Sequence, residues 1–77
     1  SPCIQLYSNI DSHYIWDNKI EKSREYKIDI KTHNKLEKKI TSIIKELHNY
    51  DTPEITSYNI NLLNINYIKW FEGNLNI

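Results

Sequence analysis

Residues 3–32 read CIQLYSNIDSHYIWDNKIEKSREYKIDIKT, and this stretch decides the fold. Apolar and polar side chains alternate in residues 3–16, and this period of two predicts a half-buried strand. Asp17 and Asn18 follow, and both residue types tolerate the positive φ of a type I′ turn. The alternation resumes in residues 19–32, so the sequence predicts a long antiparallel hairpin. The apolar positions of its first strand share one parity and are expected on one face: Ile4, Leu6, Ile10, Tyr14 and Trp16.

The hydrophobic period changes to that of a helix in residues 34–48. Asn34 is the predicted N-cap, and Glu37 three residues later completes a capping box. Pro53 prevents any continuation of this helix. The apolar residues at i, i+4, i+7, i+8 and i+11 form one stripe along it: Leu36, Ile40, Ile43, Ile44 and Leu47.

A third, shorter strand is predicted over residues 54–62. Asn64 is suited to cap a last short helix, and Gly73 is a natural end for it. The predicted order is therefore β-β-α-β-α, in a single α+β domain that occupies residues 1–77 without a linker or an internal repeat. The apolar content of the predicted third strand comes from Ile55, Tyr58, Ile60 and Leu62.

The composition excludes several classes of protein. Ten Lys and Arg balance ten Asp and Glu, so the chain lacks the basic footprint of a nucleic-acid binder. One glycine is too few for either common phosphate-binding loop, and one cysteine cannot form an intrachain disulfide. No apolar run approaches ~18 residues, so no transmembrane segment is predicted. The chain begins with Ser1 rather than Met, which leaves targeting undecided, and the working expectation is a cytoplasmic location.

Cys3 and His48 are the side chains with the most reactive chemistry. A Cys–His nucleophilic pair is conceivable, but a small buried residue at the start of a core strand is the simpler interpretation of Cys3. The three histidines, His13, His33 and His48, lack the helical spacing of metal ligands. Residues 48–54 hold the densest group of polar, potentially liganding side chains, and they fit a helix-to-strand connection equally well. No constellation indicates catalysis, and we do not expect an enzyme.

Several segments resemble motifs of the divalent-cation tolerance proteins, the CutA family, in the family's order and without gaps. Residues 3–6 are similar to the motif C-V-N-I, residues 12–21 to S-x-Y-x-W-x-G-x-I/V-E, and residues 25–32 to E-x-x-L-x-I-K-T. Residues 47–55 are similar to L-H-P-Y-E-x-P-E-I, and residues 67–70 to Y-L-x-W. Asn9 and Asn18 stand where the family usually has Gly, and Asn is best able to keep a positive φ there. In the H-P-Y-E portion, Asn49 replaces the Pro and Asp51 replaces the Glu.

The resemblance implies a ferredoxin-like, PII-like antiparallel sheet with helices on one face. Family members carry a further strand and helix before the Cys, so the native protein is expected to have about 30–35 more N-terminal residues. No enzymatic reaction is established for the family, whose members are homotrimers linked to tolerance of copper and other divalent metals. Family copper proposals fall on Cys3 and His48, whose thiolate and imidazole suit copper, and Glu54 is a third candidate ligand.

An alternative function is a PII-like signalling or interaction scaffold, which binds a small effector or a protein partner in clefts between subunits. The resemblance to the PII shape motivates it, together with the aromatic residues Tyr14, Trp16, Tyr50 and Trp70. Titration with copper separates the two functions.

The length of the hairpin argues independently for an oligomer. Residues 4–16 at ~3.3 Å each span about 43 Å, whereas a compact globule of this size measures only about 30 Å across. Unless the hairpin is strongly bent, for instance by a bulge near Asn9, its tip overhangs the core. The tip would carry Tyr14, Trp16 and Ile20 into water, so these residues are the expected subunit interface of a homotrimer.

Overall fold

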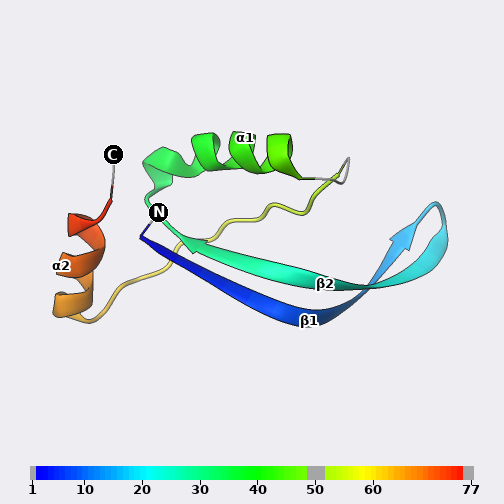
Figure 1. Cartoon of the computed structure of the whole chain (residues 1–77), viewed down its shortest axis with the longest axis horizontal. Coiled ribbons are helices and arrows are strands. Elements are labelled where there is room, and N and C mark those ends of the chain that lie inside the picture. The colour runs from blue at the N-terminus through cyan, green and yellow to red at the C-terminus, as the bar shows by residue number, and fades with distance from the viewer. Residues whose placement is uncertain (1, 49–51, 76–77) are drawn as a thin grey trace.

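The computed structural model describes residues 2–48 and 52–75. A long hairpin of β1 (Cys3–Trp16) and β2 (Lys19–Lys31) is followed by a 3₁₀ turn, η1 (Asn34–Leu36), and by helix α1 (Glu37–Leu47). An extended segment then leads to a second helix, α2 (Ile65–Gly73), which lies near the open end of the hairpin (Figure 1). The predicted hairpin and both predicted helices are confirmed.

The turn of the hairpin has the predicted geometry. Asp17 and Asn18 have φ angles of 51° and 62°, and a type I′ turn requires positive φ at both central residues. The register is antiparallel throughout, from Cys3 opposite Lys31 to Trp16 opposite Lys19. Local turn chemistry therefore sets the pairing of both strands.

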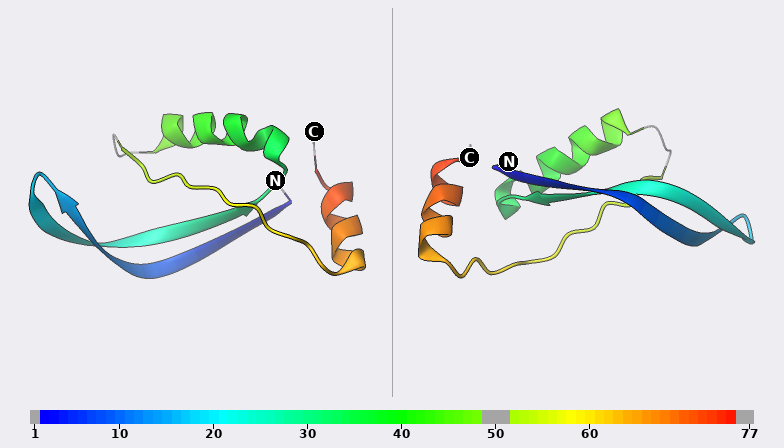
Figure 2. Two further views of the ribbon diagram at one scale, coloured as in Figure 1. Left: turned by 180° about the vertical axis from the view of Figure 1, so that it is seen from behind. Right: turned by 60° about the horizontal axis from the view of Figure 1, so that its bottom comes forward.

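A bulge interrupts the hairpin between Tyr7 and Ile10. Asn9 has a φ of 59°, so the positive φ expected at this position is confirmed. The partners change from Tyr7 opposite Lys27 to Ile10 opposite Glu25, which gives β1 one more residue than β2 in this interval. The bulge bends and twists the strand near Asn9, which is the exception that the sequence analysis allowed to a straight hairpin (Figure 2).

The extra residue moves the apolar side chains of β1 onto two faces. Before the bulge, Ile4 and Leu6 lie opposite Ile30 and Ile28. Beyond it, Tyr14 and Trp16 lie opposite Glu21 and Lys19, which have the other parity in β2 and therefore belong to the other face. The expectation that the five apolar residues of β1 share one face is therefore wrong.

We predict that replacing Asn9 by Val lowers the free energy of unfolding by about 1–2 kcal/mol, because a side chain with a branched Cβ clashes with the backbone at positive φ. Urea unfolding measures this change. Asn9→Gly is the control, since glycine adopts positive φ without strain and keeps the wild-type stability or exceeds it. Equal midpoints for Asn9→Val and Asn9→Gly would contradict the assignment.

The first helix begins differently from the prediction. The N-cap is His33, whose Nδ1 accepts the backbone N–H of Lys35 at 3.1 Å, and Asn34 is the first residue of η1. Glu37 does not complete a capping box, because its Oε1 accepts the hydroxyl of Ser57 at 2.7 Å. The predicted N-cap and capping box are wrong because a tertiary contact engages the Glu37 carboxylate and a 3₁₀ turn precedes α1.

The predicted third strand does not form. Residues 53–64 are extended, but the sheet in the described part of the chain has two strands, in the order β1-β2. Figures 1 and 2 show the extended segment running along the hairpin between the two helices. A strand requires backbone hydrogen bonds to a neighbouring strand. In the described part of the chain, β1 and β2 pair with each other, and residues 54–62 pair with neither of them. The side-chain pattern of residues 54–62 favours an extended backbone, but it does not supply a neighbouring strand to which that backbone can hydrogen-bond.

The second helix has the predicted N-cap. Oδ1 of Asn64 accepts the N–H groups of Asn66 and Tyr67 at 2.9 and 3.4 Å. Gly73 is its last residue, as expected, but its φ is not positive. Instead, Nδ2 of Asn74 donates to the carbonyl of Trp70 at 2.8 Å and satisfies one of the final carbonyls.

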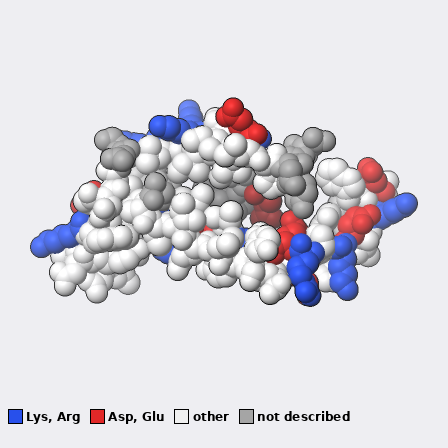
Figure 3. All heavy atoms as spheres, in the orientation of Figure 1, with Lys and Arg blue, Asp and Glu red and all other residues white. Residues whose placement is uncertain are grey.

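Little of the apolar surface is buried. Among the described residues, Phe71 alone is a buried hydrophobic side chain, with 6% of its surface exposed. The radius of gyration is 15.4 Å and the longest dimension is 47 Å, which confirms that the hairpin is long relative to the core. Figure 3 shows a broad uncharged surface over α2 and the open end of the hairpin, while charged side chains gather over α1 and the turn end. Within the described ranges, neither helix has the length and apolar character needed to cross a membrane.

Candidate functional site

Cys3 lies at the open end of the hairpin against helix α2. Its side chain is half-buried, and Cys3 is opposite Lys31 in the ladder. Partial burial raises the pKa of Tyr67, and a hydrogen bond with Cys3 raises it further. This hydrogen bond joins α2 to the start of β1. The sequence places Tyr67 in the segment that resembles Y-L-x-W, and only the packing of α2 reveals its contact with Cys3.

His48 lies at the C-terminal end of α1. It is the C-cap of this helix, and its N–H donates to the carbonyl of Ile44 at 2.8 Å. The eleven residues of α1 rise about 16 Å, and η1 adds further length. Cys3 lies beside the strand end that precedes η1, so the two candidate ligands are at opposite ends of α1.

The candidate metal ligands do not form a site within one chain. A metal bond to thiolate or imidazole is about 2.0–2.3 Å long, far shorter than the length of α1. Glu54 is exposed and follows Pro53, while Asn49, Tyr50 and Asp51 lie outside the described residues. In the ranges 2–48 and 52–75, no three His, Cys, Asp or Glu side chains are close enough to hold a metal ion. The thiolate of Cys3 and the imidazole of His48 suit copper chemically, but within one chain they lie too far apart to bind the same ion.

The turn end of the hairpin exposes apolar side chains on both faces. Trp16 and Ile20 are 55% and 81% exposed, and Tyr14 is exposed as well. Trp16 and Tyr14 lie on one face, whereas Ile20 lies opposite Ile15 on the other. The predicted interface residues therefore surround the tip, and both faces of the tip are available to another molecule.

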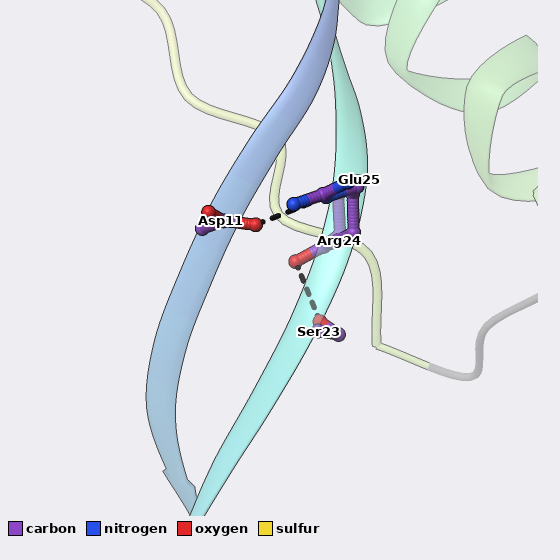
Figure 4. A network of polar contacts seen from close by, with 4 residues as sticks. All are labelled: Asp11, Ser23, Arg24 and Glu25. Atoms are coloured by element: carbon purple, nitrogen blue, oxygen red, sulfur yellow. Dashed lines mark hydrogen bonds and ion pairs between the residues drawn. The ribbon is translucent and has the colours of Figure 1, made fainter.

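A polar network separates this tip from the bulge (Figure 4). Nε of Arg24 donates to Oδ1 of Asp11 at 3.1 Å, across the two strands. On the opposite face, the Ser23 hydroxyl donates to Glu25 at 3.2 Å. The side chains of Arg24 and Asp11 are 68% and 54% exposed, so their ion pair contributes little to stability.

The face that carries Cys3 continues as a polar ladder. Nζ of Lys31 donates to Oε1 of Gln5 at 2.8 Å, and Lys27 lies 5.5 Å from the ring centre of Tyr7. A hydrogen bond from Tyr7 to Asp29, together with the negative charge of that carboxylate, raises the pKa of Tyr7. The cross-strand register shows which of these side chains interact.

The comparison with known proteins decides the family. The model of the CutA1 divalent ion tolerance protein family matches residues 1–74. The chain belongs to the CutA1 family. A probable divalent-cation tolerance homologue from Encephalitozoon cuniculi is 37% identical over 71 residues, which are 92% of this chain and 61% of that protein. The divalent-cation tolerance protein of Pyrococcus horikoshii is 36% identical over 66 residues, covering 82% of this chain and 65% of that protein.

Solved structures of the CutA1 family confirm the fold. CutA1 from Oryza sativa superimposes with a TM-score of 0.91 at 29% identity, covering 97% of this chain and 69% of that one. CutA1 from Ehrlichia chaffeensis gives a TM-score of 0.82 at 35% identity, covering 94% and 67%. The predicted α+β, ferredoxin-like class is therefore correct. The chain spans 40% and 65% of the length of curated relatives from rice and P. horikoshii.

Proposed function

We propose that this chain acts in divalent-cation tolerance as a homotrimer that binds copper between its subunits. The match of the CutA1 family model over residues 1–74 carries the proposal. Curated relatives are named for divalent-cation tolerance, which supports a relation to metal ions. The role is one of binding, without catalysis, and the location is the cytoplasm. A related structure from Archaeoglobus fulgidus is described as a periplasmic protein, and this description applies to the A. fulgidus protein.

The placement of the candidate ligands supports a site between chains. Cys3 and His48 are separated by the length of α1 within one chain, so a shared ion requires Cys3 of one subunit and His48 of its neighbour. Glu54 follows His48 closely in sequence and is exposed, so it can add an oxygen ligand from the same subunit as His48. A thiolate and an imidazole are ligands that copper prefers.

We predict that the Cys3→Ser, His48→Ala double variant loses copper affinity by about 100-fold or more, since loss of even an outer-shell partner of a metal ligand costs about 10–100-fold. Anaerobic titration with Cu(I), and with Cu(II) in parallel, measures the affinity. His13→Ala is the matched control, because His13 is exposed on β1, away from both ligands. Unchanged affinity in the double variant would refute copper binding at these residues.

A mixing experiment tests the location between subunits. Cys3→Ser and His48→Ala chains are unfolded together and refolded, so that mixed trimers form. Some interfaces then combine an intact Cys3 from one chain with an intact His48 from the other. Copper binding is expected in the mixture, but in neither variant alone. A mixture that binds no copper would place the ligands elsewhere.

A PII-like signalling or interaction scaffold is the second candidate function. The partial exposure of Trp16 and Trp70 on different elements supports it, since exposed aromatic side chains anchor small effectors and protein partners. Copper binding that is independent of Cys3 and His48 would favour this alternative.

A further inference from the structure

The extended segment that follows α1 is attached to the N-terminal end of this helix. The Ser57 hydroxyl donates to Oε1 of Glu37 at 2.7 Å, and Glu37 is the first residue of α1. Figures 1 and 2 show the segment returning along α1. It runs from the helix end that His48 caps toward the end that Glu37 begins. The contact therefore sets how far the returning segment is displaced along the helix.

The lengths of the two elements place Glu54 near the level of His48. The eleven residues of α1 rise about 16 Å, which separates Glu37 from His48 along the helix axis. The three extended residues from Ser57 back to Glu54 span about 10 Å. Glu54 is therefore displaced from His48 by about 6 Å along the axis, a distance that two side chains can close to reach one ion.

The chain around Glu54 presents its carboxylate outward. Pro53 directly before it has a φ fixed by its ring, which limits the freedom of the backbone there. Pro53 and Ile55 are half-buried, whereas Glu54 between them is exposed. Successive side chains of an extended chain point to opposite sides, so the Glu54 carboxylate faces away from the side that carries Pro53 and Ile55. The carboxylate is therefore accessible to an ion.

We propose that the hydrogen bond from Ser57 to Glu37 positions the Glu54 ligand, so that Ser57 is a positioning residue of the copper site. This inference rests on the proposed function, in which His48 and Glu54 of one subunit share an ion with Cys3 of its neighbour. Oxygen and nitrogen ligands suit Cu(II), whereas a thiolate favours Cu(I). Without the Ser57 contact, Glu54 samples a wider range of positions and must be ordered when the ion binds. Loss of the contact therefore weakens the binding of Cu(II) in particular.

The experiment is a titration of the full chain with Cu(II) and, anaerobically, with Cu(I). Ser57→Ala is expected to lower the Cu(II) affinity about fivefold, the usual net contribution of one hydrogen bond. The Cu(I) affinity is expected to change by no more than about twofold, because the thiolate and the imidazole dominate it. A general loosening of the chain would instead lower both affinities by the same factor. An unchanged Cu(II) affinity, or equal losses for the two ions, would overturn the inference.

A double-mutant cycle tests whether Ser57 acts through Glu54. Glu54→Gln removes the charged ligand, so Ser57→Ala is expected to cause no further loss of Cu(II) affinity in that background. Independent losses that add in the double variant would show that Ser57 does not act through Glu54. Ser57→Thr keeps a hydroxyl and should recover the affinity. Ser42→Ala is the matched control, because it removes an exposed hydroxyl from α1.

A measurement without metal tests the contact itself. In the metal-free chain, a nuclear Overhauser effect is expected between the Hβ protons of Ser57 and the Hγ protons of Glu37, and its absence would overturn the inference. The outcomes also separate this inference from the proposed function. Cu(II) binding that depends on Cys3 and His48 but not on Ser57 overturns the inference alone. Copper binding that is unchanged in the Cys3→Ser, His48→Ala variant refutes the proposed function and the role of Ser57 with it.

Discussion

Replacing Trp16 and Ile20 together by glutamate is expected to dissociate the proposed homotrimer and so to reduce the mass of the particle in solution to one third. These side chains are 55% and 81% exposed at the turn end of the hairpin, on opposite faces. Burial of a large apolar side chain stabilises an association by about 1.5–3 kcal/mol, and three equivalent contacts multiply the effect. A carboxylate in the same position must instead be desolvated, which opposes association.

Light scattering on the wild-type chain and on the Trp16→Glu, Ile20→Glu variant measures the mass. Lys39→Glu is the control, because it adds a carboxylate to an exposed position of α1 away from the tip and should leave the trimer intact. Circular dichroism verifies that the variant keeps its secondary structure. A wild-type chain that is monomeric at micromolar concentration, or a variant that stays trimeric, would refute the tip as the interface.

Phe71→Ala is expected to lower the free energy of unfolding by about 3–5 kcal/mol, as is usual for truncation of a buried phenylalanine. Phe71 is 6% exposed and is the most buried side chain that the structure describes. Its ring lies 6.3 Å from that of Tyr67, which contacts Cys3, so the cavity would also weaken the attachment of α2 to β1. A chain with so small a core has little stability to lose.

Thermal unfolding followed by circular dichroism measures the effect of Phe71→Ala. Phe71→Leu retains most of the buried volume and should recover most of the stability. Trp70→Ala is the matched control, because Trp70 precedes Phe71 in the same helix but is 48% exposed. Equal losses for Trp70→Ala and Phe71→Ala would show that burial of Phe71 does not hold α2 in place.

Features that depend on neighbouring residues were predictable from the sequence. Asp17 and Asn18 determine a turn by their own backbone preferences, and Asn64 caps the N–H groups of the residues directly after it. The motifs also identified the family, which the matching family model confirms. In each case the information lies within a few residues of the structure that it specifies.

Features that depend on distant partners were not predictable in the same way. Residues 54–62 have the side chains of a strand, but a ladder depends on another strand at their edge. Glu37 has the spacing of a capping box, but Ser57 engages its carboxylate from twenty residues away. Cys3 and His48 are both reasonable copper ligands by type, and only the position of α1 shows that one chain keeps them apart. Side-chain type specifies chemistry, whereas the fold specifies proximity.

The bulge at Asn9 lengthens β1 by one residue without disturbing β2, because Tyr7 opposite Lys27 and Ile10 opposite Glu25 lie on the same side of that strand. Removing one residue between Tyr7 and Ile10 would therefore abolish the bulge and its bend, and would leave every cross-strand pair from Ile10 to Trp16 as it is. The tip would keep its composition and its pairing, but it would point in another direction relative to the base of the hairpin. A single-codon deletion here would thus change the path of the ribbon, whereas a substitution changes the strain at one residue.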